Sequence, residues 1–404
     1  MIIRHTYLDR IKPFIDKPLI KVLTGVRRSG KSVLLQQIQN LLLEKGVPAS
    51  HFYIINFESS EALHIQNGTD LIQDIRQKHG QPKDKLYIFL DEIQDLSGWE
   101  KAVNALRVDF DCDIYITGSN STLLSGELAT HIAGRYVSFD VYPFSFMEFL
   151  ELLRKTDPGI SEQKAFEKYI KLGGMPFLHH INFEEEPSKQ YLEDLYASVL
   201  IKDVVSRNNI RDADLLQRLV LFLISNIGNP FSARSISAYL KNEYRNIAPE
   251  TVINYIKACV DACLFYPAKR QDLVGKKVLQ IDEKYYLVDH GIRQAVYGEN
   301  ERDIHLVLEN IVYMELIRRG YKVSVGRIGD KEIDFVAQDG YQRLYVQVSY
   351  LMADEATFER EIRPLLLVQD NYPKLIISMD PINRSTQGIQ HFPIVEFLLK
   401  SGTL

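Results

Sequence analysis

A glycine-rich stretch that ends in a lysine and a serine is the part of the chain best suited to chemistry. Its sequence, Gly25-Val26-Arg27-Arg28-Ser29-Gly30-Lys31-Ser32, matches the pattern G-x-x-x-x-G-K-[ST]. The two glycines allow backbone conformations closed to other residues, so successive N–H groups can converge on a phosphate at a helix N-terminus. We expect Lys31 to reach the β- and γ-phosphates of a nucleotide, and the Ser32 hydroxyl to ligate Mg²⁺.

Two acidic residues follow a buried strand and supply the rest of this chemistry. The uninterrupted apolar run at residues 86–90 is typical of a strand buried on both faces of a parallel sheet, and it ends in Asp91-Glu92. We expect Asp91 to hold Mg²⁺ through water, and Glu92 to orient or deprotonate the attacking water. Sixty positions separate Lys31 from Asp91, which leaves room for another strand, at residues 51–57, and a crossover helix. This spacing favours an ATPase with an extra central strand over a small GTPase or kinase.

Two further polar positions are candidates for contact with the γ-phosphate. The strand at residues 113–117 runs into Gly118-Ser119-Asn120, and ligands in open α/β sheets bind at the carboxyl ends of the strands. Asn120, or Ser119 in a shifted register, is the candidate γ-phosphate sensor, with a plain polar turn as the alternative. Arg135 is a candidate arginine finger that neutralises transition-state charge, and a surface ion pair is an equally good interpretation.

These residues need one sheet edge to bring them together. An apolar run at residues 19–24 precedes the glycine stretch and a helix-like run begins at Val33, which is the strand, turn and helix order that a phosphate-binding loop requires. The sequence therefore predicts an α/β fold with a parallel sheet of the P-loop NTPase type.

The motifs together resemble those of the AAA-type ATPases of bacteria and archaea that carry a conserved C-terminal domain of unknown function. The shared phrases are residues 25–32, 86–94 with Trp99, 116–121, 134–135, 142–149, 172–176, 202–205, 284–291 and 332–335. The resemblance covers nearly the whole chain and implies ATP binding and hydrolysis with Mg²⁺. In related signal-transduction ATPases a Gly-x-Pro in the lid contacts adenine. Gly174-Met175-Pro176 matches this phrase, so the resemblance implies that Pro176 binds the nucleotide.

The motifs divide the chain into four expected domains. Residues 1–150 are an AAA-type P-loop core and residues 151–210 a helical lid. Residues 211–299 resemble a winged helix, because three helices are followed by a hairpin with a basic turn. The basic residues of that turn are Lys269, Arg270, Lys276 and Lys277. Residues 300–404 form a small α/β domain.

The winged-helix prediction leaves two functions open. The third helix, which begins at Pro249, carries Lys257 against Glu250 and Asp261, and this is weak for base readout. The basic hairpin is suited to contact phosphates without specifying sequence. Binding of duplex nucleic acid, and a role in docking a protein or supporting the lid, are therefore both retained.

The last hundred residues resemble the core of the restriction-endonuclease-like nucleases. The expected elements are an amphipathic helix, a strand and a hairpin, at residues 306–318, 320–325 and 332–349. In the resembled nucleases an acid on the helix, an Asp on the second strand and a Glu/Gln-x-Lys on the third hold Mg²⁺ and activate water. Glu309, Asp334 and Gln347 fill three of these positions, but Ser349 replaces the lysine and Gln347 is neutral. We therefore expect a degenerate domain that binds nucleic acid or protein, with an active nuclease as the alternative.

Composition limits the remaining classes of partner. The chain is 46% hydrophobic and 25% charged, as in ordinary globular proteins, and no stretch approaches the roughly 20 apolar residues of a membrane span. The formal net charge of −5 argues against wholesale coating of nucleic acid, although a local basic patch can still bind it. We expect ATP as a partner and no membrane; nucleic acid, a protein partner and a homo-oligomer stay open.

The cysteines and the N-terminus suggest the compartment. Three cysteines suit a reducing cytoplasm, and the N-terminus has no apolar signal region, so the expected localisation is cytoplasmic. Cys259 and Cys263 are four positions apart, and we expect them to pack in a core from one helix face rather than to bind a metal.

Overall fold

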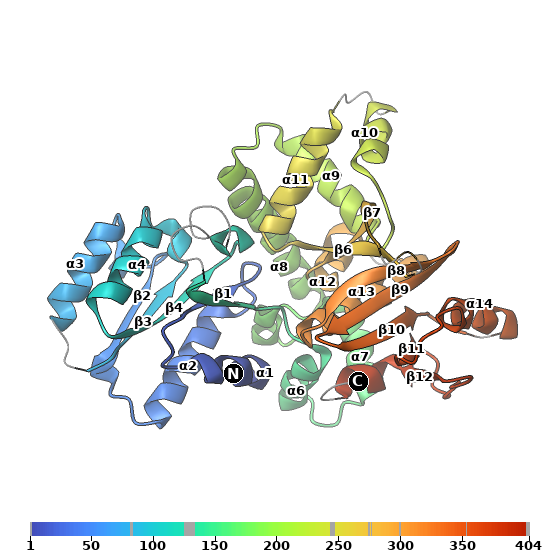
Figure 1. The fold of residues 1–404 in the computed structure, drawn as a ribbon, viewed down its shortest axis with the longest axis horizontal. Helices are drawn as coiled ribbons and strands as arrows, with labels where there is room; N and C mark the ends of the chain where they lie inside the picture. Colours follow the sequence, from blue (N-terminus) through green and yellow to red (C-terminus); the bar gives the residue numbers. More distant parts are fainter. Residues whose placement is uncertain are drawn as a thin grey trace. The chain divides into compact units, whose positions relative to one another are not determined.

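The fold comes from a computed structural model that describes residues 2–80, 84–124, 134–242, 247–273, 275, 277–298, 300–352 and 354–400. The chain forms two compact units (Figure 1). The first comprises residues 1–142 with Asp261–Cys263, and the second comprises residues 143–260 and 264–404.

A parallel sheet forms the centre of the first unit. Within the described residues it has five strands in the order β2-β3-β4-β1-β5. The strands are β1 (Ile20–Thr24), β2 (Phe52–Asn56), β3 (Leu86–Asp91), β4 (Cys112–Gly118) and β5 (Tyr136–Asp140). The strand between β1 and β3 is β4, whereas β2 lies at the edge. The predicted α/β class and the extra central strand are therefore confirmed.

Helices cover both faces of this sheet. The helices are α1 (His5–Ile11), α2 (Lys31–Glu44), α3 (Gly68–His79) and α4 (Trp99–Asp109). The connection from β1 to β2 runs across the sheet in the direction opposite to the later connections, so right-handed crossovers place α2 on one face and α3 and α4 on the other (Figure 1). β1 and β3 are buried along their whole length, as expected for inner strands of a covered parallel sheet.

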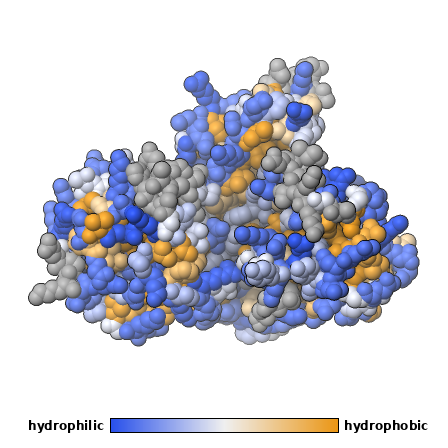
Figure 2. Space-filling model, viewed as in Figure 1, coloured by the Kyte–Doolittle hydropathy of each residue, from blue (hydrophilic) through white to orange (hydrophobic). Residues whose placement is uncertain are grey.

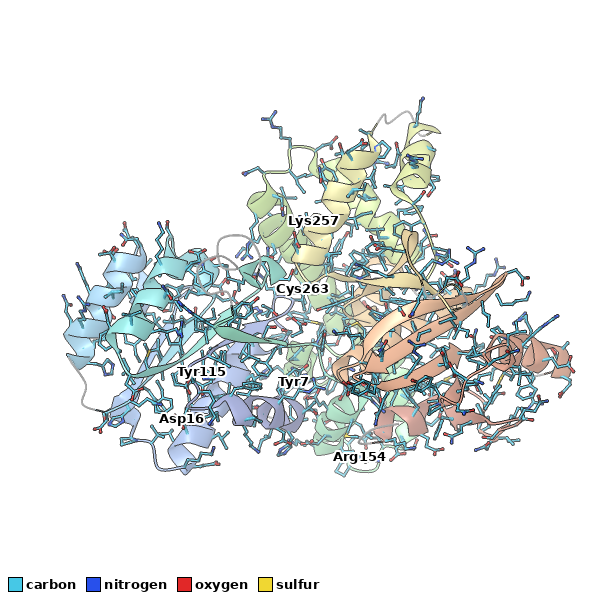
Figure 3. The ribbon with its side chains drawn as sticks, in the orientation of Figure 1. Tyr7, Asp16, Tyr115, Arg154, Lys257 and Cys263 are labelled. Carbon is cyan, nitrogen blue, oxygen red and sulfur yellow. The ribbon has the colours of Figure 1, made fainter. Side chains whose placement is uncertain are left out.

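A buried polar network fixes the amino ends of these strands. Lys21 and Asp113 form an ion pair with almost no solvent exposure, and the Tyr115 hydroxyl donates to Asp113 Oδ2 at 2.8 Å. The Asp16 backbone N–H donates to the same oxygen at 2.9 Å (Figure 3). These charges are paired within the protein. The candidate catalytic groups are therefore those at the carboxyl edge of the sheet.

The second unit contains a mixed sheet with helices before and around it. Seven strands are found in its described residues, in the order β12-β11-β10-β9-β8-β6-β7. The strands are β6 (Phe265–Asp272), β7 (Lys277–Leu287), β8 (Lys322–Ile328), β9 (Lys331–Asp339), β10 (Gln342–Val348), β11 (Lys374–Ser378) and β12 (Ile389–Pro393). The helices are α6 (Phe146–Thr156), α7 (Glu162–Leu172), α8 (Glu185–Ser198), a π-helix (Val199–Ser206), α9 (Ala213–Ser225), α10 (Ala233–Asn242), α11 (Pro249–Asp261), α12 (His290–Tyr297), α13 (Ile304–Arg318), α14 (Glu355–Leu366) and α15 (Ile394–Leu399).

The elements expected for a winged helix are present, but their hairpin is part of the larger sheet. Helices α9, α10 and α11 precede the antiparallel pair β6–β7, and β6 also pairs in parallel with β8. The sheet therefore crosses the boundary predicted at residue 300. Whether residues 211–299 act as a winged helix stays a prediction.

Two local expectations for this half of the chain were wrong. Helix α13 is not amphipathic: its residues are buried on every side, because it packs against β7, β8, β9 and β10 as well as α12. Helix α11 ends at Asp261, and Cys263 lies beyond it with φ of +56°, so the two cysteines do not share a helix face. Both are buried, which raises the pKa of each thiol to about 12 and agrees with core packing.

None of the helices in the described ranges is both long enough and apolar enough to cross a membrane. On the face drawn in Figure 2, hydrophilic residues surround separate hydrophobic patches.

Candidate functional site

The glycine-rich stretch forms a tight loop between β1 and α2. Gly25 has φ of +147°, and a Cβ atom there would lie 2.3 Å from the Val141 carbonyl oxygen, so no other residue fits. Gly30 has φ of +97° and is the N-cap of α2, which begins at Lys31. The loop backbone therefore meets a helix N-terminus at the carboxyl end of an inner strand, the geometry that binds phosphate.

Lys31 is buried beneath this loop. Its side-chain nitrogen donates to the carbonyl oxygens of Gly25 and Val26 at 3.1 and 3.2 Å, and it lies 3.5 Å from Glu92 Oε1. Lys31 is 3% exposed. The ammonium group is thus held between the loop and the acidic residue that the sequence predicted as the base.

The other loop residues differ in their surroundings. Val26 is buried, and Arg27 pairs with Glu58 at 2.8 Å. Arg28 is exposed and has φ of +67°, in the left-handed region. The Ser29 hydroxyl is buried and has no hydrogen-bond partner among the described residues. A buried hydroxyl without a partner is costly, and an anion in the loop would satisfy it.

Asp91 lies at the end of β3, among three side-chain donors. Thr117 Oγ1 donates to Asp91 Oδ1 at 2.5 Å and Asn56 Nδ2 donates to Asp91 Oδ2 at 2.8 Å. Burial raises the pKa of Asp91, and hydrogen bonds from Thr117 and Ser32 oppose this rise. The predicted Mg²⁺ ligands Ser32 and Asp91 are therefore in contact. A hydroxyl and a carboxylate are oxygen ligands of the kind that Mg²⁺ prefers, so the residues fit the ion.

Glu92 follows in a strained conformation. Its φ is +53°, which is uncommon for a residue other than glycine and is found mainly where function maintains it. The Glu92 backbone N–H donates to Thr117 Oγ1 at 2.9 Å, and Gln94 Nε2 donates to Glu92 Oε2 at 2.5 Å. These contacts fix the carboxylate beside Lys31.

Three residues of this network were missed by the sequence analysis. Thr117 joins Asp91 to Glu92, Asn56 holds Asp91 from β2, and Gln94 holds Glu92. Asn56 and Thr117 reach Asp91 because β2 and β4 lie on either side of β3. This strand order could not be predicted from the sequence. The signal for Gln94 was present, since it lies in one of the shared phrases.

The proposed γ-phosphate sensor lies at the same edge. Ser119 and Asn120 directly follow β4 and are 0% and 6% exposed. β4 pairs with β1 on one side and β3 on the other, so its end lies between the loop and Asp91. The position suits a sensor, and the role of Asn120 stays a prediction.

Arg135 lies at the opposite edge. It directly precedes β5, and its carbonyl oxygen accepts from the N–H of Ile20, at the start of β1. Because β1 and β5 are parallel, Arg135 is at the amino end of the sheet whereas the glycine loop is at the carboxyl end. Its guanidinium donates to Asn104 Oδ1 at 3.1 Å. Arg135 is therefore not gathered with the other candidates in its own chain.

Pro176 belongs to the second unit, where it begins a short 3₁₀ helix. The glycines before it have a structural reason to be small. The Gly174 N–H donates to Asp289 Oδ2 at 2.7 Å, and a Cβ atom on Gly173 would lie 2.0 Å from Asp289 Oδ1. Residues of two shared phrases, 172–176 and 284–291, therefore pack closely against each other. Contact of Pro176 with adenine stays a prediction.

The three nuclease-type positions also come together in the second unit. The Asp334 backbone N–H approaches Gln347 Oε1 at 3.4 Å. Burial, and after it the negative charge of Glu309, raise the pKa of the Asp334 carboxyl. Ser349 is 7% exposed, and its N–H donates to the carbonyl of Ile377. Lys284, which the sequence analysis did not connect with these positions, lies 3.1 Å from Glu309.

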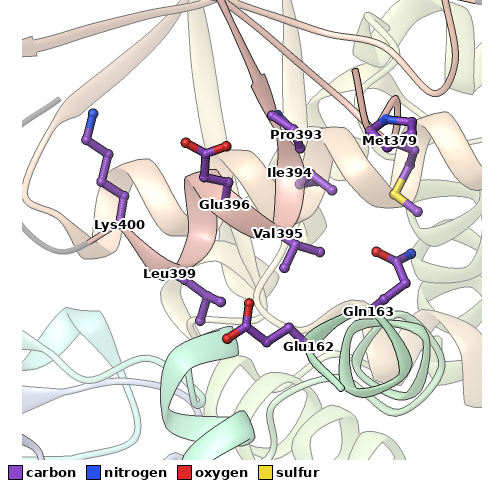
Figure 4. Close-up of a pocket in the computed structure, with 10 residues that line it drawn as sticks. Glu162, Gln163, Met379, Pro393, Ile394, Val395, Glu396, Leu399 and Lys400 are labelled. Atoms are coloured by element: carbon purple, nitrogen blue, oxygen red, sulfur yellow. The ribbon is translucent and has the colours of Figure 1, made fainter. Parts of the chain in front are cut away.

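A separate pocket in the second unit holds none of these residues. It has a volume of about 690 Å³ and lies between α7 and α15, with Glu162 and Gln163 on one side and Val395 and Leu399 on the other (Figure 4). We therefore assign it no role.

Known families match most of the chain. Residues 17–150 match the family described as an AAA domain, and residues 163–303 match a domain of unknown function, DUF8612. The second match covers the predicted lid and winged helix rather than the last hundred residues.

Relatives span nearly the full length. An uncharacterized protein of Haemophilus influenzae is 39% identical over 402 residues, covering 99% of both chains. An uncharacterized protein of Methanocaldococcus jannaschii is 31% identical over 356 residues, covering 85% of this chain and 77% of the relative.

Among solved structures, the likeness is remote. The Aeropyrum pernix ORC1 protein in complex with DNA has a TM-score of 0.32 at 14% identity, covering 73% of this chain and 91% of that one. A signal transduction ATPase with numerous domains from Pyrococcus horikoshii has a TM-score of 0.30 at 13% identity, covering 79% and 46%. These scores carry no argument about function. With the loop, the strand order and the full-length relatives taken together, the chain belongs to an AAA-type P-loop family that includes the Haemophilus influenzae protein.

Proposed function

We propose that the protein binds ATP with Mg²⁺, hydrolyses it, and uses the nucleotide state to reposition its second compact unit. The observation that carries the proposal is the joined network of Lys31, Glu92, Thr117 and Asp91 directly below the glycine loop. A buried cation, a strained carboxylate and a second carboxylate at one sheet edge are the groups that phosphoryl transfer to water requires.

Each group has a distinct role in this proposal. The loop N–H groups, the Ser29 hydroxyl and Lys31 bind the β- and γ-phosphates, and Ser32 with Asp91 holds Mg²⁺. The ion, when bound, neutralises charge that develops on the phosphate oxygens. Glu92 accepts a proton from the attacking water, for which its fixed orientation prepares it. Asn120 contacts the γ-phosphate, and Pro176 contacts the adenine.

Contacts around the loop support the switch. Arg4 Nη1 donates to the carbonyl oxygens of Ser29 at 3.2 Å and of Tyr142 at 2.9 Å, and Tyr142 is the last residue of the first unit before the chain continues as Pro143. Arg4 is 2% exposed. A change in the loop on nucleotide binding therefore acts on the segment from which the chain leaves the first unit.

The test is ATP hydrolysis by the purified full chain, measured with and without Mg²⁺ and with duplex or single-stranded DNA added. We expect Mg²⁺-dependent release of phosphate. Absence of both ATP binding and hydrolysis would refute the proposal. Stimulation by one DNA form would favour the alternative function below, and no effect of DNA would favour a protein-directed switch.

The alternative is an ATP-gated effector that binds or processes DNA, with residual nuclease activity. Lys257 on α11 (Figure 3) and Lys269 on β6 are exposed, which favours contact with phosphates. Arg270 is less available, because it pairs with Glu332 at 3.2 Å. Lys276 and the Lys277 side chain lie outside the described residues. Fragmentation of DNA by wild type, lost in Asp334→Asn, would support this alternative.

We predict that Thr117→Val slows hydrolysis by roughly tenfold or more while ATP still binds. Valine has the shape of threonine but leaves the buried Glu92 N–H without its acceptor and removes one of the donors to Asp91, at a cost of about 1–3 kcal/mol. The measurement is kcat together with denaturant unfolding. Thr69→Val, at an exposed position, is the matched control. An unchanged kcat would show that Thr117 does not orient the acidic pair.

For Arg135 we predict dependence on a second copy of the chain. Because Arg135 lies at the edge opposite its own loop, it can complete an active site only in a neighbouring subunit. Specific hydrolysis should therefore rise with protein concentration, and Arg135→Ala should reduce turnover but not ATP binding. Arg76→Ala, another exposed arginine, serves as the control. Turnover that does not depend on concentration would remove Arg135 from the mechanism.

A further inference from the structure

A buried ion cluster connects three elements of the second unit. Lys284 on β7 lies 3.1 Å from Glu309 Oε1 on α13 and 2.7 Å from Glu332 Oε1 on β9. The Tyr286 hydroxyl donates to the same Glu309 oxygen at 2.6 Å. The Lys284 side chain is 4% exposed, so its charge is compensated by protein groups rather than by water.

The cluster keeps Lys284 charged. Burial alone would lower the pKa of its ammonium, but the nearby carboxylates of Glu309, Asp334 and Glu332 reverse this effect and raise it. For Asp334, burial and the negative charge of Glu309 raise the pKa of its carboxyl, whereas the positive charge of Lys284 lowers it. Lys284 is therefore the central cation for acids that come from two separate elements.

This arrangement does not fit the metal that the nuclease resemblance implies. A divalent ion would need Glu309 and Asp334 as ligands, yet one Glu309 oxygen already accepts from both Lys284 and Tyr286. One Asp334 oxygen accepts from the Val348 N–H at 2.8 Å. Across the described residues, no group of three or more His, Cys, Asp or Glu side chains is arranged to hold a metal ion.

Both polar atoms of the Gln347 side chain also make contacts within the protein. Its Nε2 donates to Glu361 Oε2 at 3.2 Å on α14, and its Oε1 faces the Asp334 N–H. The position that supplies a metal ligand in the resembled nucleases thus takes part in hydrogen bonds between secondary-structure elements.

We propose that the Lys284 ammonium takes the place of a divalent cation in this cluster, so that wild type binds no metal there. The cluster instead fastens the hairpin β6–β7 to α13 and β9. Arg270 on β6 strengthens the connection, because it pairs with the second oxygen of Glu332. Two positive side chains thus face three carboxylates, and removing one partner of a buried pair leaves an uncompensated charge.

The proposed cluster gives one structural reason for two of the shared phrases, residues 284–291 and 332–335. Lys284 and Tyr286 come from the first phrase, and Glu332 and Asp334 from the second. The lysine absent from position 349 is supplied by a strand distant in sequence, where it binds the acids directly.

The test is binding of Mn²⁺ to the nucleotide-free full chain, measured by calorimetry on wild type, Asp334→Asn, Lys284→Met and the double variant. We expect wild type and Asp334→Asn to be alike. Lys284→Met should gain a Mn²⁺-binding event that the double variant loses. Any Mn²⁺ bound near Asp91 contributes equally to all four proteins. Lys322→Met, at an exposed position on β8, is the control and should gain nothing.

Thermal unfolding gives a second readout. The midpoint for Lys284→Met should fall by several degrees and recover in millimolar Mn²⁺, whereas wild type should not respond. If Lys284→Met does not fold, Lys284→Gln replaces it, because glutamine can still donate to the carboxylates. Loss of Mn²⁺ binding in Asp334→Asn relative to wild type would overturn the proposal, and so would a folded Lys284 variant that gains no Mn²⁺ site.

Discussion

Glu92→Gln is expected to bind ATP with near wild-type affinity and to hydrolyse it at least about 100-fold more slowly. The amide keeps the size of the side chain and can still accept the hydrogen bond from Gln94, but it cannot take a proton from water. The backbone contact with Thr117 is unchanged, so the strained conformation at this position is kept. Phosphate release measures the rate and calorimetry measures binding.

A matched substitution separates this effect from a general loss of charge. Glu44→Gln changes an exposed glutamate at the end of α2 and should hydrolyse ATP at the wild-type rate. Should Glu92→Gln also turn over at that rate, another group must be the base, and Asp91 would become the next candidate.

For Lys31→Ala we expect loss of both nucleotide affinity and hydrolysis, with the fold intact. A hydrogen bond to a charged group contributes about 1.5–3 kcal/mol, so ATP should bind roughly 10- to 150-fold more weakly. Alanine favours helix at the first position of α2, and Glu92 loses an ion-pair partner at 3.5 Å without becoming isolated, because Gln94 still contacts it.

The control for this variant is Lys45→Ala, at an exposed position after the same helix. Circular dichroism and thermal unfolding establish that each protein is folded. Normal ATP affinity in Lys31→Ala would mean that the nucleotide binds elsewhere, and the proposed function would then fail.

The sequence was informative where chemistry depends on neighbours in the chain. The loop at residues 25–32 and the pair Asp91-Glu92 each need only a strand, a turn and a few adjacent residues, and both lie where they were expected. The sequence also predicted that the loop and the acidic pair lie close together, because parallel strands end at one edge of a sheet. Asn56 and Thr117 could not be found in this way, since their contacts depend on which strands are adjacent.

In the second half of the chain, too, local elements were predictable from the sequence, whereas contacts between distant elements were not. The helix with Glu309 and the hairpin at residues 332–349 were predicted from local patterns. The lysine that pairs with Glu309 is not close to Ser349 in the sequence: it is Lys284 on β7, a strand that precedes α13. Burial around all of α13 likewise depends on β7, which precedes it, and on β8, β9 and β10, which follow it.

The strand order also has a consequence for synthesis of the chain. The described strands of the first sheet all precede residue 141, so this sheet can form while the rest of the chain is still being made. Strand β6 must wait for β8, which begins at Lys322, before its second edge is paired. A nascent or truncated chain that stops between these strands exposes an unpaired edge, a template for aggregation. Fragments of this protein are therefore best ended before β6 or after β12.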